Sequence, residues 1–122
     1  MARYMILILG DEKQWDAMTP EDSSTIEKGH LRFREVADSV GATILAAGEL
    51  ESSSTTTTLK AVGDDRPTVT DGPFLESKEA LGGFYVVRAE DLDAVIAMAS
   101  ALHEVRGGHS AVEIRPLVDH GE

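Results

Sequence analysis

The sequence contains no cysteine. This excludes disulfide bonds, a thiolate nucleophile and cysteine-ligated zinc, and it is typical of a reducing compartment. Long apolar runs are also missing. The apolar run near the start, Met5–Leu9, is far too short to cross a membrane or to form a signal-peptide core. We therefore expect a cytoplasmic protein without a membrane partner.

Aromatic and basic residues are scarce. One tryptophan, two tyrosines and three phenylalanines predict a mainly aliphatic core and no platform for stacking single-stranded nucleic acid. The net charge of −11 repels phosphate backbones, so no nucleic-acid partner is expected. The acidity has two interpretations: the more ordinary one is solubility, and the other is a cationic ligand or a basic protein partner.

The chain has the length of one domain, which we place at residues 1–118, followed by a short tail at 119–122. Its apolar pattern predicts strands over residues 4–9, 43–50, 55–62, 68–70, 84–87 and 111–117. A polar loop is expected over residues 10–18, and one or two helical turns over residues 75–81.

Two longer helices are expected. The first should begin at Thr19, where a capping hydroxyl precedes a proline and two acids, and should end near Gly41. The second should open at Glu90-Asp91 and end at Gly107-Gly108.

The expected order of elements is strand, helix, strand, hairpin, strand, helix, strand. This is the split β-α-β arrangement of the ferredoxin-like α+β class with an inserted β-hairpin. Two helices can cover only one face of the sheet, yet the strands carry apolar residues on both faces. We therefore expect a second copy to cover the other face, which gives a homodimer.

Two short segments carry a family resemblance: Asp71–Phe74 (Asp-Gly-Pro-Phe) and Gly82–Tyr85 (Gly-Gly-Phe-Tyr). Their spacing, with the closing segment Val112–Pro116, resembles the YCII-related family and its DGPF branch over nearly the whole chain. The resemblance implies a ferredoxin-like fold that pairs sheet to sheet in a dimeric α+β barrel. It also implies a pocket with a histidine and an aspartate, on which an enzymatic activity of no agreed reaction is suspected. Some relatives resemble partners of extracytoplasmic-function sigma factors, which implies a regulatory alternative.

Asp71 is the strongest candidate for a functional carboxylate. It also has a structural interpretation of equal weight, because in such a turn Asp71 can accept hydrogen bonds from backbone N–H groups, Gly72 permits positive φ and Pro73 fixes the exit. In the functional interpretation Asp71 lies at the mouth of a cleft, as a general base or as the orienting partner of a histidine.

His30 is expected on the apolar stripe of the first helix, between Ile26 and Phe33. A histidine in such a position is more often a satisfied, partly buried residue than a catalyst. His30 also matches the helix-1 histidine of the YCII-related family, which gives the two interpretations equal weight. If His30 faces Asp71, the carboxylate would hold one imidazole tautomer and make the other nitrogen basic near neutral pH.

The remaining candidates are expected around this pair. Trp15, Phe74 and Tyr85 could line an apolar pocket, although core packing is the default for the last two. Glu49 is more ordinarily an exposed strand-end acid, but beside Asp71 it would form a coupled carboxylate pair. No two histidines have the spacing of a zinc helix and no glycines form a phosphate or dinucleotide loop, so we expect neither a metal nor an organic cofactor.

The leading hypothesis is a homodimeric small-molecule enzyme in which His30 and Asp71 perform acid–base chemistry beside the Asp71–Phe74 turn. One alternative is a non-catalytic interaction module that acts on a transcription factor. Another is a small-ligand binder without turnover. The fold alone does not choose among them.

Overall fold

The computed structural model describes residues 1–61, 63, 66–75 and 79–121. One antiparallel sheet has the strand order β2-β5-β1-β6, made of β1 (Ala2–Asp11), β2 (Thr43–Glu49), β5 (Glu79–Ala89) and β6 (Ser110–Pro116). A separate two-stranded sheet pairs β3 (Thr57–Ala61) with β4 (Pro67–Asp71). The mixed α+β architecture and this strand order are compatible with the ferredoxin-like class expected from the sequence.

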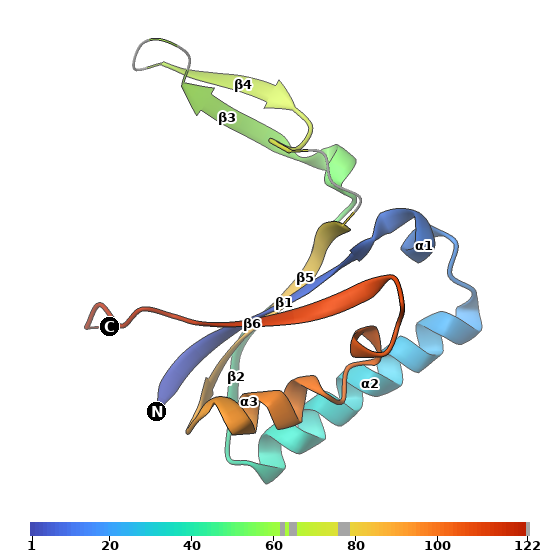
Figure 1. Cartoon of the computed structure of the whole chain (residues 1–122), viewed down its shortest axis with the longest axis vertical. Helices are drawn as coiled ribbons and strands as arrows, with labels where there is room; N and C mark the ends of the chain where they lie inside the picture. Colours follow the sequence, from blue (N-terminus) through green and yellow to red (C-terminus); the bar gives the residue numbers. More distant parts are fainter. Residues whose placement is uncertain (62, 64–65, 76–78, 122) are drawn as a thin grey trace.

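The helices are α1 (Glu12–Asp16), α2 (Pro20–Ser39) and α3 (Leu92–Ala99), with short 3-10 turns η1 (Ser53–Thr55) and η2 (His103–Val105). Helix α2 begins where predicted. The backbone N–H of Asp22 donates to the Thr19 hydroxyl at 3.2 Å, and the backbone N–H of Thr19 donates to the Asp22 carboxylate at 3.1 Å, which together form a capping box. Helices α2 and α3 lie on the same side of the four-stranded sheet (Figure 1).

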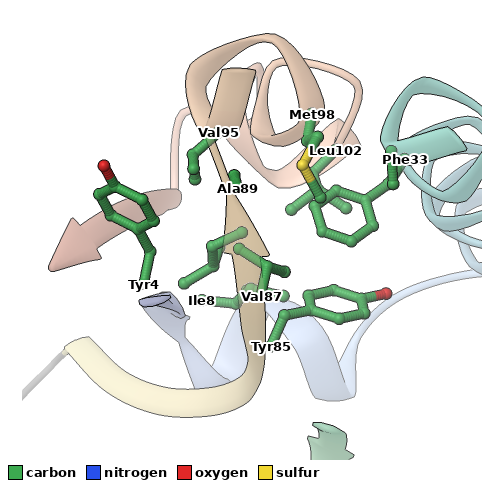
Figure 2. Packing of buried hydrophobic residues seen from close by; sticks show 11 residues of the cluster. Tyr4, Ile8, Phe33, Tyr85, Val87, Ala89, Val95, Met98 and Leu102 are labelled. Atoms are coloured by element: carbon green, nitrogen blue, oxygen red, sulfur yellow. The ribbon is translucent and has the colours of Figure 1, made fainter. Parts of the chain in front are cut away.

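The hydrophobic core lies between that sheet and its two covering helices. Successive side chains of a strand face opposite ways, so alternate residues of β1 and β5 are buried toward the helices. The ring of Phe33 in α2 is fully buried and stacks on Tyr85 of β5, with 4.2 Å between ring centroids. Figure 2 shows Phe33, Met98 and Leu102 pointing from the helical layer toward Tyr85 and Val87. This packing fixes α2 against the middle of β5.

Strands β3 and β4 form an arm that projects from the rest of the chain (Figure 1). None of their described residues is buried, and the cross-strand pair Leu59 and Val69 is 62% and 63% exposed. At the base of the arm the backbone N–H of Gly72 donates to the Thr56 carbonyl at 2.6 Å, and Gly72 has the positive φ of 102° expected of a turn glycine. A two-stranded sheet of this kind is marginally stable by itself.

Several local predictions were wrong. Residues 12–16 form helix α1, not a loop, because the carboxylate of Asp11 caps this segment by accepting from the Lys13 backbone N–H at 3.0 Å. Helical turns were expected over residues 75–81, but Leu75 lies in a bend and residues 79–81 already belong to β5, while residues 76–78 lie outside the described part. The glycines at 82–83 lie inside β5 and do not precede it. The second helix ends at Ala99, and the chain then turns into η2.

Candidate active site

A close approach of helix α2 to the segment after α3 positions His30. A Cβ atom on Gly29 would lie 2.9 Å from the backbone nitrogen of His103 and 3.1 Å from the carbonyl oxygen of Ala101. Glycine therefore allows these two segments to pass within a distance that a larger residue would prevent. The next residue along α2 is His30, which meets Glu104 of η2 although the two are 74 positions apart.

His30 is hydrogen-bonded on both ring nitrogens. Its Nε2 lies 3.0 Å from Glu104 Oε2, and its Nδ1 lies 2.5 Å from the hydroxyl of Tyr85. The His30 side chain is 23% exposed and that of Glu104 is 9% exposed, so one end of this chain of side chains is nearly sealed from water. The result is a continuous line of carboxylate, imidazole and phenol, which we call the Glu104–His30–Tyr85 chain.

Glu104 is the only buried charged side chain among the described residues. Burial by itself raises the pKa of a carboxyl group. The hydrogen bond from His30, a backbone hydrogen bond within Glu104, and the charges of His30 and His103 outweigh burial and lower the pKa of Glu104 below its ordinary value. Glu104 is therefore a carboxylate at neutral pH.

The pKa of Tyr85 is shifted in the opposite direction, upward. Its burial raises the pKa of the phenol, the nearby Arg34 lowers it, and the carboxylate of Glu104 raises it again. The net effect is a pKa above the ordinary value, so Tyr85 carries its proton at neutral pH and is a proton donor.

These two states determine the tautomer of a neutral His30. An ionised carboxylate can only accept hydrogen bonds, so His30 Nε2 must carry the hydrogen that points to Glu104. His30 Nδ1 is then the acceptor for the hydroxyl of Tyr85. This order of donors and acceptors is the one by which a buried carboxylate orients an imidazole as a base toward a hydroxyl.

All three side chains lie in the wall of an open pocket of about 600 Å³. That volume is in the range of small-molecule sites. The apolar part of the lining includes Trp15, Met18, Ile26, Leu50 and Phe84. The charged part consists of Arg34 and five acids, Glu12, Asp16, Glu49, Glu51 and Glu104.

Trp15 forms a fixed part of this wall. Its indole Nε1–H donates to the Ser110 hydroxyl at 3.1 Å. A Cβ atom on Gly82 would lie 2.5 Å from the indole ring, and one on Gly10 would also lie 2.5 Å from it. The ring therefore rests against two glycines of the sheet, which leave it the room that a side chain would fill.

The rim of the pocket is joined to η1, the short turn that precedes the arm. Glu12 of α1 accepts hydrogen bonds from both the hydroxyl and the backbone N–H of Ser53, the latter at 2.8 Å. The side-chain hydrogen bond is the larger cause, and the two together lower the pKa of Glu12. The acid at the rim is thus held ionised and in place.

Four of the residues singled out from the sequence line this pocket: Trp15, His30, Glu49 and Tyr85. Glu49 is exposed, as its more ordinary interpretation requires, and Tyr85 is buried. The Asp71–Phe74 turn is not part of the lining. It lies where β4 ends, at the base of the arm.

Within the turn, Phe74 is not packed in the core. Core packing was the default for Phe74, but the ring is 64% exposed and lies 5.1 Å from Lys60 Nζ. Among the described residues the carboxylate of Asp71 makes no hydrogen bond, so the fold of the turn rests on Gly72 and its backbone contacts. Within one chain His30 therefore takes its carboxylate from Glu104, and pairing with Asp71 stays a prediction.

Sequence reasoning missed Glu104. On a helix continued past Ala99, Glu104 would lie about 200° around the axis from Leu102, away from the apolar face. The chain leaves the α-helix at Ser100, and the 3-10 turn η2 redirects Glu104 inward. No pattern in the residues around Glu104 indicates that the α-helix ends at Ala99, so the sequence carries no signal for an inward-facing Glu104.

The described residues contain no group of three or more histidine and acidic side chains arranged to hold a metal ion. Within the same ranges, no helix combines the length and the apolar character needed to cross a membrane.

Two comparisons with known proteins give consistent results. The family model described as the YCII-related domain matches residues 2–118. A protein of Rhizobium meliloti (strain 1021), described as uncharacterized protein R00369, is 26% identical over 114 residues, which cover 93% of this chain and 90% of that protein.

Proposed function

The chain belongs to the YCII-related family, and on that premise we propose that it is a small-molecule enzyme that performs acid–base chemistry at His30. The observation that carries this proposal is the Glu104–His30–Tyr85 chain in the wall of a pocket of about 600 Å³. A buried charge is energetically costly unless it is paired. Glu104 is buried and stays ionised through its hydrogen bond with His30, which indicates that it serves to orient the imidazole.

The proposed mechanism is proton exchange through Tyr85. The phenol gives a proton to the bound molecule or takes one from it. His30 Nδ1, 2.5 Å away, accepts and returns the phenol proton. Glu104 stabilises the imidazolium that forms when His30 has taken the proton, because the carboxylate lies 3.0 Å from Nε2.

The second part of the proposal is a homodimer of the dimeric α+β barrel type, built as in the DGPF branch of the family. Helices cover one face of the four-stranded sheet, and Met5, Leu7 and Val86 lie half-buried on the strand positions that alternate with the core. A second copy would cover this face. Asp71 does not line the pocket of its own chain. In the proposed dimer, the arm would carry Asp71 of one copy to the pocket of the other.

Light scattering tests the dimer. A mass of twice 13.1 kDa is expected for the wild-type protein, and Leu7→Asp should shift it toward the monomer. A monomer mass for the wild type at micromolar concentration would remove the barrel from the proposal.

Deuterium exchange tests the chemistry. Acetylacetone and acetone, two small ketones without a carboxylate, are incubated in D₂O with the protein, and loss of their exchangeable C–H signals is followed by proton NMR. We expect exchange faster than in buffer with the wild type, and loss of the acceleration in His30→Gln. His120→Gln, in the exposed tail, is the matched control and should match the wild type. Equal exchange in the wild type and His30→Gln across both probes would contradict the proposal.

A non-catalytic interaction module is a second candidate, and the arm is the observation that favours it. Leu59, Val69, Phe74 and Leu75 are all more than 60% exposed, so the arm presents apolar side chains that a protein partner could cover. A transcription factor partner is one form of this candidate. It predicts that Val69→Asp abolishes partner binding and leaves exchange catalysis at the pocket unchanged.

A further inference from the structure

One oxygen of Glu104 has no partner. Oε2 is bonded to His30, whereas Oε1 is buried and makes no hydrogen bond to any described residue. The whole residue is only 8% exposed. A buried carboxylate oxygen without a donor is unfavourable, because it has lost its water without gaining a replacement. Glu104 lines the pocket, so a donor that reaches its floor can supply the missing hydrogen bond.

The charge of the pocket indicates the kind of donor. Five carboxylates line it, against a single guanidinium among the described residues, that of Arg34. Glu12 is held ionised by Ser53, and Glu104 is held ionised by His30. Low-dielectric walls concentrate the field of such groups, so the pocket attracts cations and repels anions.

The apolar wall indicates the rest of the molecule. Trp15, Phe84 and Leu50 line the same space as the acids, and Trp15 is fixed against two glycines of the sheet. An aromatic ring both packs against apolar groups and attracts a nearby cation through its face. The pocket thus offers an apolar surface and a negative floor.

We propose that the pocket takes a small organic amine, protonated on nitrogen, whose N–H groups bond to Glu104 Oε1 and whose apolar body packs on Trp15. This inference rests on the proposed function, since it names the class of molecule on which the same site acts. The ammonium lies at the floor of the pocket, next to the Glu104–His30–Tyr85 chain that can remove its proton.

Other classes of ligand fit the same features less well. A metal ion would need several ligands, and the described residues offer no such group. An anion would be repelled by the five carboxylates that line the pocket. A quaternary ammonium has the right charge but no N–H, so it cannot supply the hydrogen bond that Glu104 Oε1 lacks.

Three probes that share a phenyl ring and differ in their charged group separate these classes: benzylamine, benzyltrimethylammonium and benzoate. Trp15 is the only tryptophan in the sequence, so its fluorescence reports directly on the pocket. At neutral pH we expect benzylamine to bind saturably, and at least tenfold more tightly than either of the other probes. Tighter binding of benzoate, or no saturable binding of any probe up to millimolar concentration, would overturn the proposal.

Two variants test the residues. Glu104→Gln should weaken benzylamine binding at least tenfold, while Glu90→Gln, an exposed acid outside the pocket, should leave it unchanged. If Glu104→Gln does not fold, as judged by circular dichroism, the double variant Glu49→Gln/Glu51→Gln replaces it. Both of those acids are exposed at the pocket, and their loss should weaken binding severalfold. Unchanged affinity in the folded variant would contradict the inference.

The failure of this inference is distinguishable from failure of the proposed function. If benzoate binds more tightly and Arg34→Gln removes that binding, the amine is wrong while the exchange measurement still decides on chemistry at His30. If benzylamine binds through Glu104 but no exchange is catalysed, the amine site stands and the protein is a binder without turnover.

Discussion

The four-stranded sheet with its helices and the arm of β3 and β4 differ in almost every physical respect. The sheet buries residues on every second position of β1 and β5, whereas no described residue of β3 or β4 is buried. One of the two segments that carry the family resemblance, Asp71–Phe74, lies at the base of the arm. The side chains that form a hydrogen-bonded chain, by contrast, lie in the packed body. The other such segment, Gly82–Tyr85, lies in β5 and supplies Tyr85 to that chain, so only the body combines a family segment with a chemically organised site.

The largest expected effect comes from truncating one side chain in the body and one on the arm. Phe33→Ala removes a fully buried ring that stacks on Tyr85, and should lower the free energy of unfolding by about 3–5 kcal/mol. Val69→Ala, at a position 63% exposed on the arm, should change it by less than about 0.5 kcal/mol. Urea denaturation at low protein concentration measures both. Equal costs would mean that the arm is packed against something a single chain does not contain.

A smaller effect is expected from Gly29→Ala. The added methyl group would lie 2.9 Å from the His103 nitrogen, and relieving this contact requires α2 and the 101–103 segment to separate. We expect a loss of about 1–3 kcal/mol in the free energy of unfolding, despite the better helix propensity of alanine, and loss of the His30–Glu104 hydrogen bond. Lys28→Ala, on the exposed neighbouring position, gives the propensity gain alone and should not destabilise. A stabilising Gly29→Ala would show that the two segments do not approach this closely.

The smallest stability effect concerns pH. Because the pKa of Glu104 is lowered on folding, its ionised form contributes stability above the ordinary glutamate pKa of about 4.3, and this contribution is lost as pH falls through the lower folded pKa. Stability should therefore fall less steeply below about pH 4.3 in Glu104→Gln than in the wild type. Glu90→Gln, exposed and outside the pocket, should keep the wild-type slope. Identical slopes for all three proteins would mean that Glu104 is not held ionised by the fold.

The sequence was sufficient for features whose causes are local. Thr19 and Pro20 predicted the start of α2, since a cap and a proline act within one turn. The apolar stripe placed Phe33 in the core, and it placed His30 on the same face of the helix, where its side chain is only 23% exposed. The succession of the six strands along the chain followed from their apolar patterns.

The sequence was insufficient where distant segments decide. Glu104 is functional in our account because η2 turns inward and Gly29 lets α2 approach it, and neither fact is visible in the residues around Glu104. The strand expected over residues 84–87 left out the glycines at 82–83, yet they lie within β5, where Trp15 rests on Gly82. The role of Gly82 is to leave room for the indole ring of Trp15, and that ring comes from a distant part of the chain.

The central claim is that Glu104 orients His30 as a base toward Tyr85. Two-bond proton–nitrogen correlation NMR reads the protonation of each imidazole nitrogen, and His30→Gln assigns the signals of this ring. At a pH where the ring is neutral, our account predicts the proton on Nε2 and a bare, accepting Nδ1, and it predicts that this preference weakens in Glu104→Gln. A wild-type His30 that carries its proton on Nδ1, or that divides it evenly between the two nitrogens, would contradict the claim.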